Sequence, residues 1–380
     1  MSKSSPIEIL PGAHRKSDAA TGASVAGLRT AASQVIAFYF RAPAKAFFRT
    51  RVDYLVLAKA VNPRIKAQES WSWRISVPGL LGHAVASNGW SFIPNQVLPP
   101  LLANIGIGAI LYTSYLQILG QQYPPFSKPV KRVFPPPPAR DTFIAGAAAG
   151  AIQSVVAAPI DVLQFRFKTD DILSGKYKNM WRYGFGKLRE IGPRGAFAGW
   201  GLSLVKDTVG YGIFFATFEY VKAQSYYAFA TRYYGNLQAW TLGGLPRQER
   251  VGASGIPTIK PHYAIEPAFL LFAGVSASVL QQLINHPLSA IQEVHHSGLD
   301  ERPQAFSRSA YEKTLRECSS HVLGAGGWRQ YFYRGFIWDT LRQIPSTSAG
   351  LVIFELVRRR YADESEAMRI QKDGYEIVLS

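Results

Sequence analysis

The chain contains stretches of uncharged residues that are long enough to cross a lipid bilayer as helices. Residues 142–160 are a run of 19 without Asp, Glu, Lys or Arg, and residues 267–292 are a run of 26. About 20 apolar residues in a helix span a hydrocarbon layer of about 30 Å. The 53 uncharged residues between Arg74 and Lys128 are interrupted by prolines, so only residues 101–120 form an unbroken candidate there. The sequence therefore predicts a helical membrane protein.

Three further candidate spans are less apolar, because each of them carries ionisable residues. They are residues 24–40 with Arg29, residues 203–220 with Lys206 and Asp207, and residues 340–356 with Arg342. Together with the first three they give six spans. An even number of spans predicts that both ends of the chain lie on the same side of the membrane.

Composition limits the other classes of function. The net charge of +17 is compatible with nucleic-acid binding, but the 42 basic residues flank apolar runs instead of clustering in one tract. Basic residues at the ends of spans are typical of membrane proteins, and we expect no nucleic-acid partner. The only cysteine, Cys318, excludes an internal disulfide. Residues 1–21 contain no apolar segment of the kind found in secretory signals, and they are interpreted as a disordered tail.

The sequence repeats itself three times. Each block has an apolar span that ends in a proline, a basic stretch with a glycine turn, and a second span that ends in an aromatic residue. The prolines are Pro43, Pro159 and Pro287, the turn glycines are Gly89, Gly192 and Gly326, and the aromatic residues are Tyr115, Phe218 and Phe354. This pattern predicts three tandem pairs of helices.

Small residues recur at a spacing that brings helices close together. Gly146 and Gly150 form a GxxxG motif, and Gly274 and Ser278 repeat the small-xxx-small spacing in another span. Such residues allow two helix backbones to approach each other in lipid. We expect both pairs to lie at helix–helix contacts.

Short charged motifs at the span ends complete a resemblance to a known family. They are Pro159-x-Asp161, Phe218-Glu219-x-x-Lys222 and Phe354-Glu355-x-x-Arg358. On these motifs the chain resembles the mitochondrial carrier family over about residues 22–361. The resemblance implies an all-α membrane protein, with six transmembrane helices in three tandem pairs around a pseudo-threefold axis. The repeats would cover about residues 22–122, 140–223 and 264–361, followed by a C-terminal tail over residues 362–380.

The resemblance also implies a gate at each mouth of the carrier. On the matrix side the gate residues would be Asp161, Gln164 and Arg166, although Gln164 stands where the family has a base. The third repeat has Ser289 and Gln292 at the charged positions, so most of the matrix network is missing. On the opposite side the gate residues would be Glu219, Lys222, Glu355 and Arg358, with each carboxylate facing a cation of a neighbouring helix.

Substrate-binding positions are carried over from the family in the same way. They are Asn104, Lys206, Asp207, Arg342 and Gln343. Ionisable side chains inside a span usually face a water-filled cavity and take part in function. Two cations and one carboxylate suggest a substrate that has a carboxylate and an amine.

We therefore expect a solute carrier of the mitochondrial inner membrane that moves a small carboxylate-bearing or amino-acid-like metabolite by alternating access. The alternative is a carrier-fold adaptor that has lost transport and lies in a mitochondrial membrane, the outer one included. No nucleophile–base arrangement suggests an enzyme, and no cofactor is expected. His295 and His296 diverge on a helix and lack metal-ligand spacing to other residues. Cardiolipin is a plausible lipid partner by resemblance alone.

Overall fold

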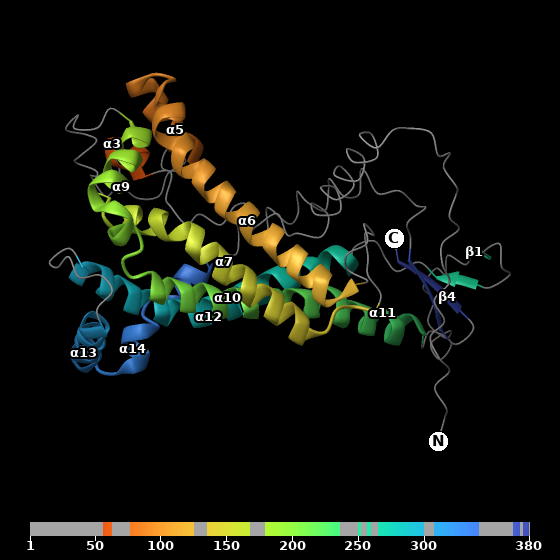
Figure 1. Cartoon of the computed structure of the whole chain (residues 1–380). Helices are drawn as coiled ribbons and strands as arrows, with labels where there is room; N and C mark the ends of the chain where they lie inside the picture. Colours follow the sequence, from red (N-terminus) through yellow and green to blue (C-terminus); the bar gives the residue numbers. More distant parts are fainter. Residues whose placement is uncertain are drawn as a thin grey trace.

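The computed structural model shows a bundle of long helices that lie side by side (Figure 1). It describes residues 56–62, 77–124, 135–167, 179–235, 250–251, 257–259, 265–299, 308–341, 368–372 and 375–379. The long helices are α6 (Leu98–Gln122), α7 (Ala139–Phe165), α10 (Trp200–Glu219) and α12 (Ile265–Leu299). The π-helical turns η2 (Ile93–Val97) and η4 (Tyr220–Ser225) extend α6 and α10, and α11 (Tyr226–Gly235) follows η4.

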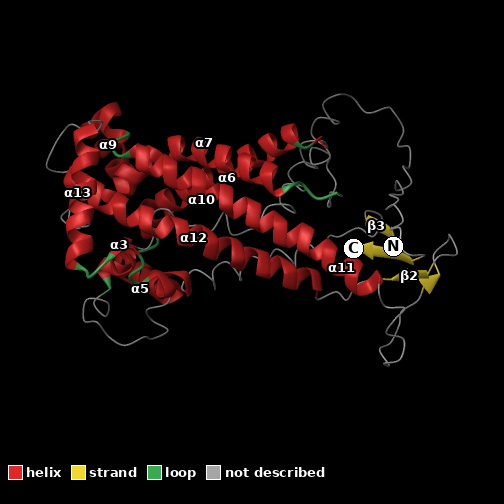
Figure 2. Cartoon of the chain, turned by 90° about the horizontal axis from the view of Figure 1, so that it is seen from below, coloured by secondary structure: helices red, strands yellow, loops and turns green. Residues whose placement is uncertain are grey.

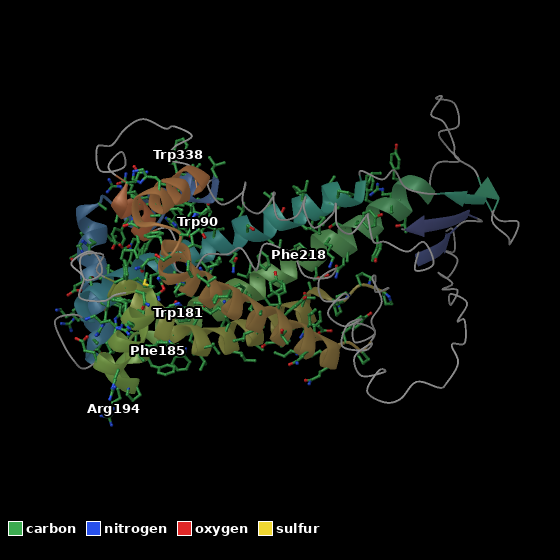
Figure 3. All side chains as sticks on the ribbon, turned by 90° about the horizontal axis from the view of Figure 1, so that it is seen from above. Trp90, Trp181, Phe185, Arg194, Phe218 and Trp338 are labelled. Carbon is green, nitrogen blue, oxygen red and sulfur yellow. The ribbon has the colours of Figure 1, made fainter. Side chains whose placement is uncertain are left out.

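Shorter helices gather at one end of this bundle (Figure 2). They are α3 (Val56–Val61), α5 (Val77–Asn88), α9 (Met180–Ala196), α13 (Arg308–Gly324) and α14 (Trp328–Phe332). Residues 336–341 are also helical. Figure 3 shows Trp90, Trp181, Phe185 and Trp338 at this end, which is called the α9 end below, whereas Phe218 lies farther along the bundle toward the strands.

Three of the described helices are long and apolar enough to cross a membrane. They cover Ile93–Gln122, Ala139–Phe165 and Pro267–Ser297, and they contain the predicted spans 101–120, 142–160 and 267–292. The fourth predicted span corresponds to α10, whose 20 residues extend about 30 Å but carry Lys206 and Asp207. The predicted span at 24–40, and the sixth span after residue 341, lie outside the described residues. Six spans therefore remain a prediction.

The helices do not end at the prolines that close the apolar runs. α7 continues from Pro159 to Phe165, and α12 continues from Pro287 to Leu299. A proline inside a helix removes one backbone hydrogen bond, and the rest of the helix tolerates this loss. The sequence reading placed these ends too early, because the residues after each proline are more polar but still helical.

Glycine turns mark the repeats in the structure as they do in the sequence. Gly89, Gly192 and Gly326 all have positive φ angles, of 78°, 71° and 82°. Only glycine adopts this backbone region without strain. The three predicted turns therefore share a positive φ angle, which supports the threefold internal repeat.

Among the four long helices, α7 packs against α6 and α10, and α10 packs against α12. The core between them is rich in aromatic residues from α6 and α10. Tyr115 stacks on Phe215 with ring centroids 3.7 Å apart, and Phe214 stacks on Phe218 at 6.1 Å. Small residues of α7 and α12 complete this cluster and leave room for the rings.

The GxxxG motif of α7 lies at its closest contact with α10. A Cβ atom added at Gly146 would lie 2.7 Å from the carbonyl oxygen of Tyr211, and one at Gly150 would lie 2.4 Å from that of Asp207. Real Cβ atoms do not approach backbone this closely, so both positions require glycine. The sequence prediction that this motif packs helices together is confirmed.

A small four-stranded sheet lies beyond α11, at the end of the bundle away from α9 (Figure 2). Its strand order is β1 (Arg250–Val251), β2 (Pro257–Ile259), β4 (Tyr375–Leu379) and β3 (Met368–Lys372). β2 pairs in parallel with β4, with Thr258 opposite Glu376, and the outer pairs are antiparallel. The all-α prediction therefore fits the bundle but omits these strands, which fall between the predicted second and third repeats and in the predicted C-terminal tail.

Candidate functional site

The start of α10 is fixed against α7 and α12 by polar and aromatic contacts. Gly199 precedes the helix with φ of 71°, and a Cβ atom there would lie 2.8 Å from His296 and 3.0 Å from His295. Trp200 donates its indole N–H to the hydroxyl of Ser154, at 3.2 Å. These contacts set the position of the first turns of α10 relative to both neighbouring helices.

Four polar side chains from three helices are linked by hydrogen bonds close to this point. Ser203 donates to Oδ2 of Asp161 at 3.4 Å, and Gln292 Nε2 donates to Oγ of Ser203 at 2.7 Å. The amide oxygen of Gln292 accepts a hydrogen bond from Nζ of Lys206. Asp161, Ser203, Lys206 and Gln292, called the polar network below, therefore connect α7, α10 and α12.

Burial makes the polar network costly unless its groups bind one another or a ligand. Asp161, Ser203 and Gln292 are each no more than 5% exposed, and Lys206 is partly buried. Asp207, the next residue on α10, is also buried. Polar groups in an apolar interior are stable only when hydrogen-bonded, and charged groups only when paired.

The network joins residues for which different roles were predicted. Asp161 was predicted as a gate residue and Lys206 as a substrate-binding residue, but they meet through Ser203 and Gln292. Sequence reasoning missed Ser203 and treated Gln292 only as a replacement for a lost base. Ser203 lies one helical turn before Lys206 and Asp207, and that spacing was a usable signal.

A stripe of buried polar residues on α12 extends the network along the bundle. The stripe consists of Ser278, Gln281, Asn285 and Gln292, all 4% exposed or less. Their spacing of three, four and seven residues places them on one face of a helix. That face lies against α10, because a Cβ atom at Gly210 would be 2.4 Å from Oδ1 of Asn285. This polar stripe was missed in the sequence, although its periodicity is visible there.

The other predicted site residues are placed as follows. Asn104 is buried on α6. Gln164 is exposed, and Arg166 is partly buried at the end of α7, where its carbonyl accepts a hydrogen bond from the hydroxyl of Tyr183 at 3.1 Å. Arg342, Gln343, Glu355 and Arg358 lie outside the described residues, so their roles stay predictions.

Two histidines at the end of α12 join three helices at the α9 end. His296 stacks on Phe165 of α7 with centroids 4.0 Å apart, and His295 stacks on Tyr311 of α13 at 4.7 Å. His295 Nδ1 also lies 2.8 Å from the hydroxyl of Thr314. Burial raises the pKa of the Tyr311 phenol. The described residues contain no group of three side chains suited to a metal ion.

Glu219 lies at the opposite end of α10 from this histidine junction. It forms an ion pair with Lys222, with 3.1 Å between Nζ and Oε1, and Lys222 also lies over the ring of Phe218. Glu219 is buried, whereas Lys222 is partly exposed. The location fits a gate at the mouth opposite Pro159 and Pro287, but this ion pair lies within one turn and does not connect two helices.

Replacing Lys222 by methionine is expected to lower the free energy of unfolding by about 1–3 kcal/mol. The change leaves the buried carboxylate of Glu219 without this ion pair, and an unsatisfied buried charge is costly. Thermal unfolding of the purified protein in detergent measures the effect. Lys313→Met is the control, because its partner Glu317 is exposed and such a pair contributes about 0.5 kcal/mol or less. Equal unfolding temperatures for both variants would show that the Glu219–Lys222 pair stabilises the protein no more than an exposed ion pair does.

Comparison with known proteins finds similarity to mitochondrial carriers over part of the chain. Residues 136–227, which include α7, α9 and α10, match the family model described as mitochondrial carrier protein. A mitochondrial thiamine pyrophosphate carrier of Botryotinia fuckeliana is 32% identical over 32% of this chain and 36% of its own length. A mitochondrial thiamine diphosphate carrier of Arabidopsis thaliana is 22% identical over 57% of this chain and 59% of its own. A mitochondrial arginine transporter of the same plant is 26% identical over 42% and 50%.

These matches span at most about three fifths of the relatives' lengths, and their identities are low. The family model covers the second repeat, where the sequence motifs were strongest and where α7 and α10 pack through glycines. The longer alignments extend the likeness beyond that repeat. Residues 136–227 are therefore similar to a mitochondrial carrier repeat, and the chain beyond them is similar to proteins of that family at low identity.

Proposed function

We propose that the protein is a membrane solute carrier that works by alternating access. The observation that supports this most is that Asp207 and the α12 polar stripe are buried, and Lys206 partly buried, between helices that are otherwise apolar. A charged side chain in a span costs about 2.5–3.5 kcal/mol on insertion scales. A helix bundle with no polar ligand gains nothing from keeping such residues between its helices.

The proposed substrate is a small metabolite that carries a carboxylate and an amine. The ammonium group of Lys206 suits a carboxylate, and the neighbouring carboxylate of Asp207 suits an amine. Two relatives support this class by name, the arginine transporter and a basic amino acids transporter of Mus musculus. The thiamine pyrophosphate and ADP,ATP carriers among the relatives point to a second anionic class that also needs a buried cation.

The proposed location is the mitochondrial inner membrane, with several spans. The family and most of the named relatives support a mitochondrial membrane, while two relatives are chloroplastic. A lipid bilayer is the proposed partner, because three described helices have the length and apolar composition of membrane spans. Cardiolipin remains a proposal from the family resemblance.

The second candidate is a carrier-fold adaptor without transport. It is favoured by the neutral residues Gln164, Ser289 and Gln292 at positions where the family pattern has charges. A carrier needs a closed state on each side, and lost ion pairs weaken one closure. The polar network weighs against this candidate, because hydrogen bonds between α7, α10 and α12 provide another contact at that end.

Uptake into liposomes that contain the purified protein tests the proposal. We expect saturable uptake of radiolabelled L-arginine or another small amino acid, with thiamine diphosphate and ADP as alternative solutes. Protein-free liposomes provide the background, and protease protection verifies that the protein is inserted. If a folded, inserted protein moves none of these solutes nor any common carboxylate, the adaptor is the correct function.

A further inference from the structure

We propose that Gln292 is a positioning residue that holds Lys206 across the contact between α10 and α12, and yields it to an anionic group of the solute. The inference rests on the proposed transport function and names the residue that couples solute binding to helix separation. Gln292 is suited to this role because it uses both ends of its amide. Its oxygen accepts from Lys206 of α10, and its nitrogen donates to Ser203 of the same helix at 2.7 Å.

The chemistry of an amide makes this contact one that a solute displaces. The ammonium group of Lys206 binds a carboxylate or phosphate more strongly than a neutral amide oxygen, because hydrogen bonds between two charged groups are roughly twice as strong. A glutamate at position 292 would compete with the solute on equal terms. An apolar residue would not compete at all. The glutamine therefore gives a contact that is strong enough to persist and weak enough to be replaced.

Displacement of Gln292 affects more than one helix. Once the solute holds Lys206, the hydrogen bond that joins Lys206 to α12 is gone. Of the two hydrogen bonds that Gln292 makes to α10, the one to Ser203 then remains, and Ser203 in turn donates to Asp161 of α7. Binding of the solute thus weakens the α10–α12 contact, and by reciprocity a firmer contact weakens binding of the solute.

Two substitutions at position 292 test this in opposite directions. The assay is uptake of L-arginine into liposomes, with thiamine diphosphate as the second probe. Gln292→Glu is expected to raise KM by about tenfold, because an ion pair with Lys206 must be broken before the solute binds. Gln292→Met removes the competitor, and its KM is expected to be equal to or below that of the wild type. A purely structural role would lower the amount of folded protein or the maximal rate in both variants without this opposite shift in KM.

Ser203→Ala provides a second test if a variant at position 292 does not fold. It keeps Gln292 and Lys206 but removes the hydroxyl that fixes the amide nitrogen, so a lower KM is expected. If the wild-type protein moves a probe and no variant separates KM in these directions, the inference is overturned and the transport function stands. If the wild-type protein moves neither probe nor any solute in the uptake panel, the transport function fails and this role of Gln292 fails with it.

Discussion

Gly150→Ala is expected to lower the free energy of unfolding by about 2–3 kcal/mol, although alanine favours helices over glycine. The added Cβ atom would lie 2.4 Å from the carbonyl oxygen of Asp207 and 2.9 Å from its carbonyl carbon. The obstacle is backbone, so no side-chain rotation relieves the overlap, and α7 must move away from α10. Overpacking of a tight contact costs about 1–3 kcal/mol, and loss of the close approach adds to it. Thermal unfolding in detergent measures the change.

Gly106→Ala in α6 is the matched control for this substitution. It makes the same chemical change within a helix, but no atom lies within 4 Å of the added Cβ. The higher helix propensity of alanine then acts alone and raises stability by up to about 1 kcal/mol. The two variants should therefore shift the unfolding temperature in opposite directions. A stable Gly150→Ala protein would mean that α7 and α10 do not approach as closely as the structure shows.

The contact at Gly150 also shows which parts of the fold were predictable from sequence. Uncharged runs identified the positions of α6, α7 and α12, because a span has a minimum length and few charges. The GxxxG motif predicted a close helix contact, and its glycines on α7 lie directly against the backbone of α10. The ends of α7 and α12 were placed too early, since the prolines Pro159 and Pro287 were read as boundaries. Proline restricts one turn but does not stop a helix that neighbouring helices hold in place.

The sheet was missed for a different reason. Its strands are short, and β2 pairs with β4 across more than a hundred residues of chain. No local periodicity in strands of two to five residues distinguishes them from loops. Pairing of this kind depends on which distant segments meet, and a single sequence contains no local sign of that.

Sequence analysis singled out the charged residues of the candidate site and missed the neutral residues that contact them. Lys206 and Asp207 stood out because ionisable residues are rare within spans. Ser203 and Gln292 are common polar residues, and their importance appears only when α10 and α12 lie together. The α12 polar stripe has a helical period that sequence analysis is able to detect, provided that polar residues are searched for periodicity as apolar ones are.

Lys206→Met is expected to reduce solute uptake by about 10- to 100-fold while the protein remains inserted. The substitution keeps most of the side-chain volume and removes the positive charge that we assign to the solute's carboxylate. A hydrogen bond to a charged group contributes about 1.5–3 kcal/mol, and each 1.4 kcal/mol corresponds to a factor of ten. The amide oxygen of Gln292 loses its donor as well, so a moderate loss of stability is expected beside the loss of uptake.

Lys313→Met controls for the loss of one positive charge elsewhere on the protein. Lys313 lies on α13 and pairs with Glu317 at 3.2 Å, with both side chains exposed. An exposed pair of this kind contributes little to stability. Lys313 and Glu317 also lie on a different helix from Lys206, about a hundred residues farther along the chain. Uptake by this variant should equal that of the wild type.

If Lys206→Met also takes up solute at the wild-type rate, Lys206 serves only to join α10 to α12 through Gln292, and the solute must bind at other residues. If wild-type uptake is saturable and only Lys206→Met loses it, the positive charge of Lys206 is part of the transport path, which an adaptor does not require.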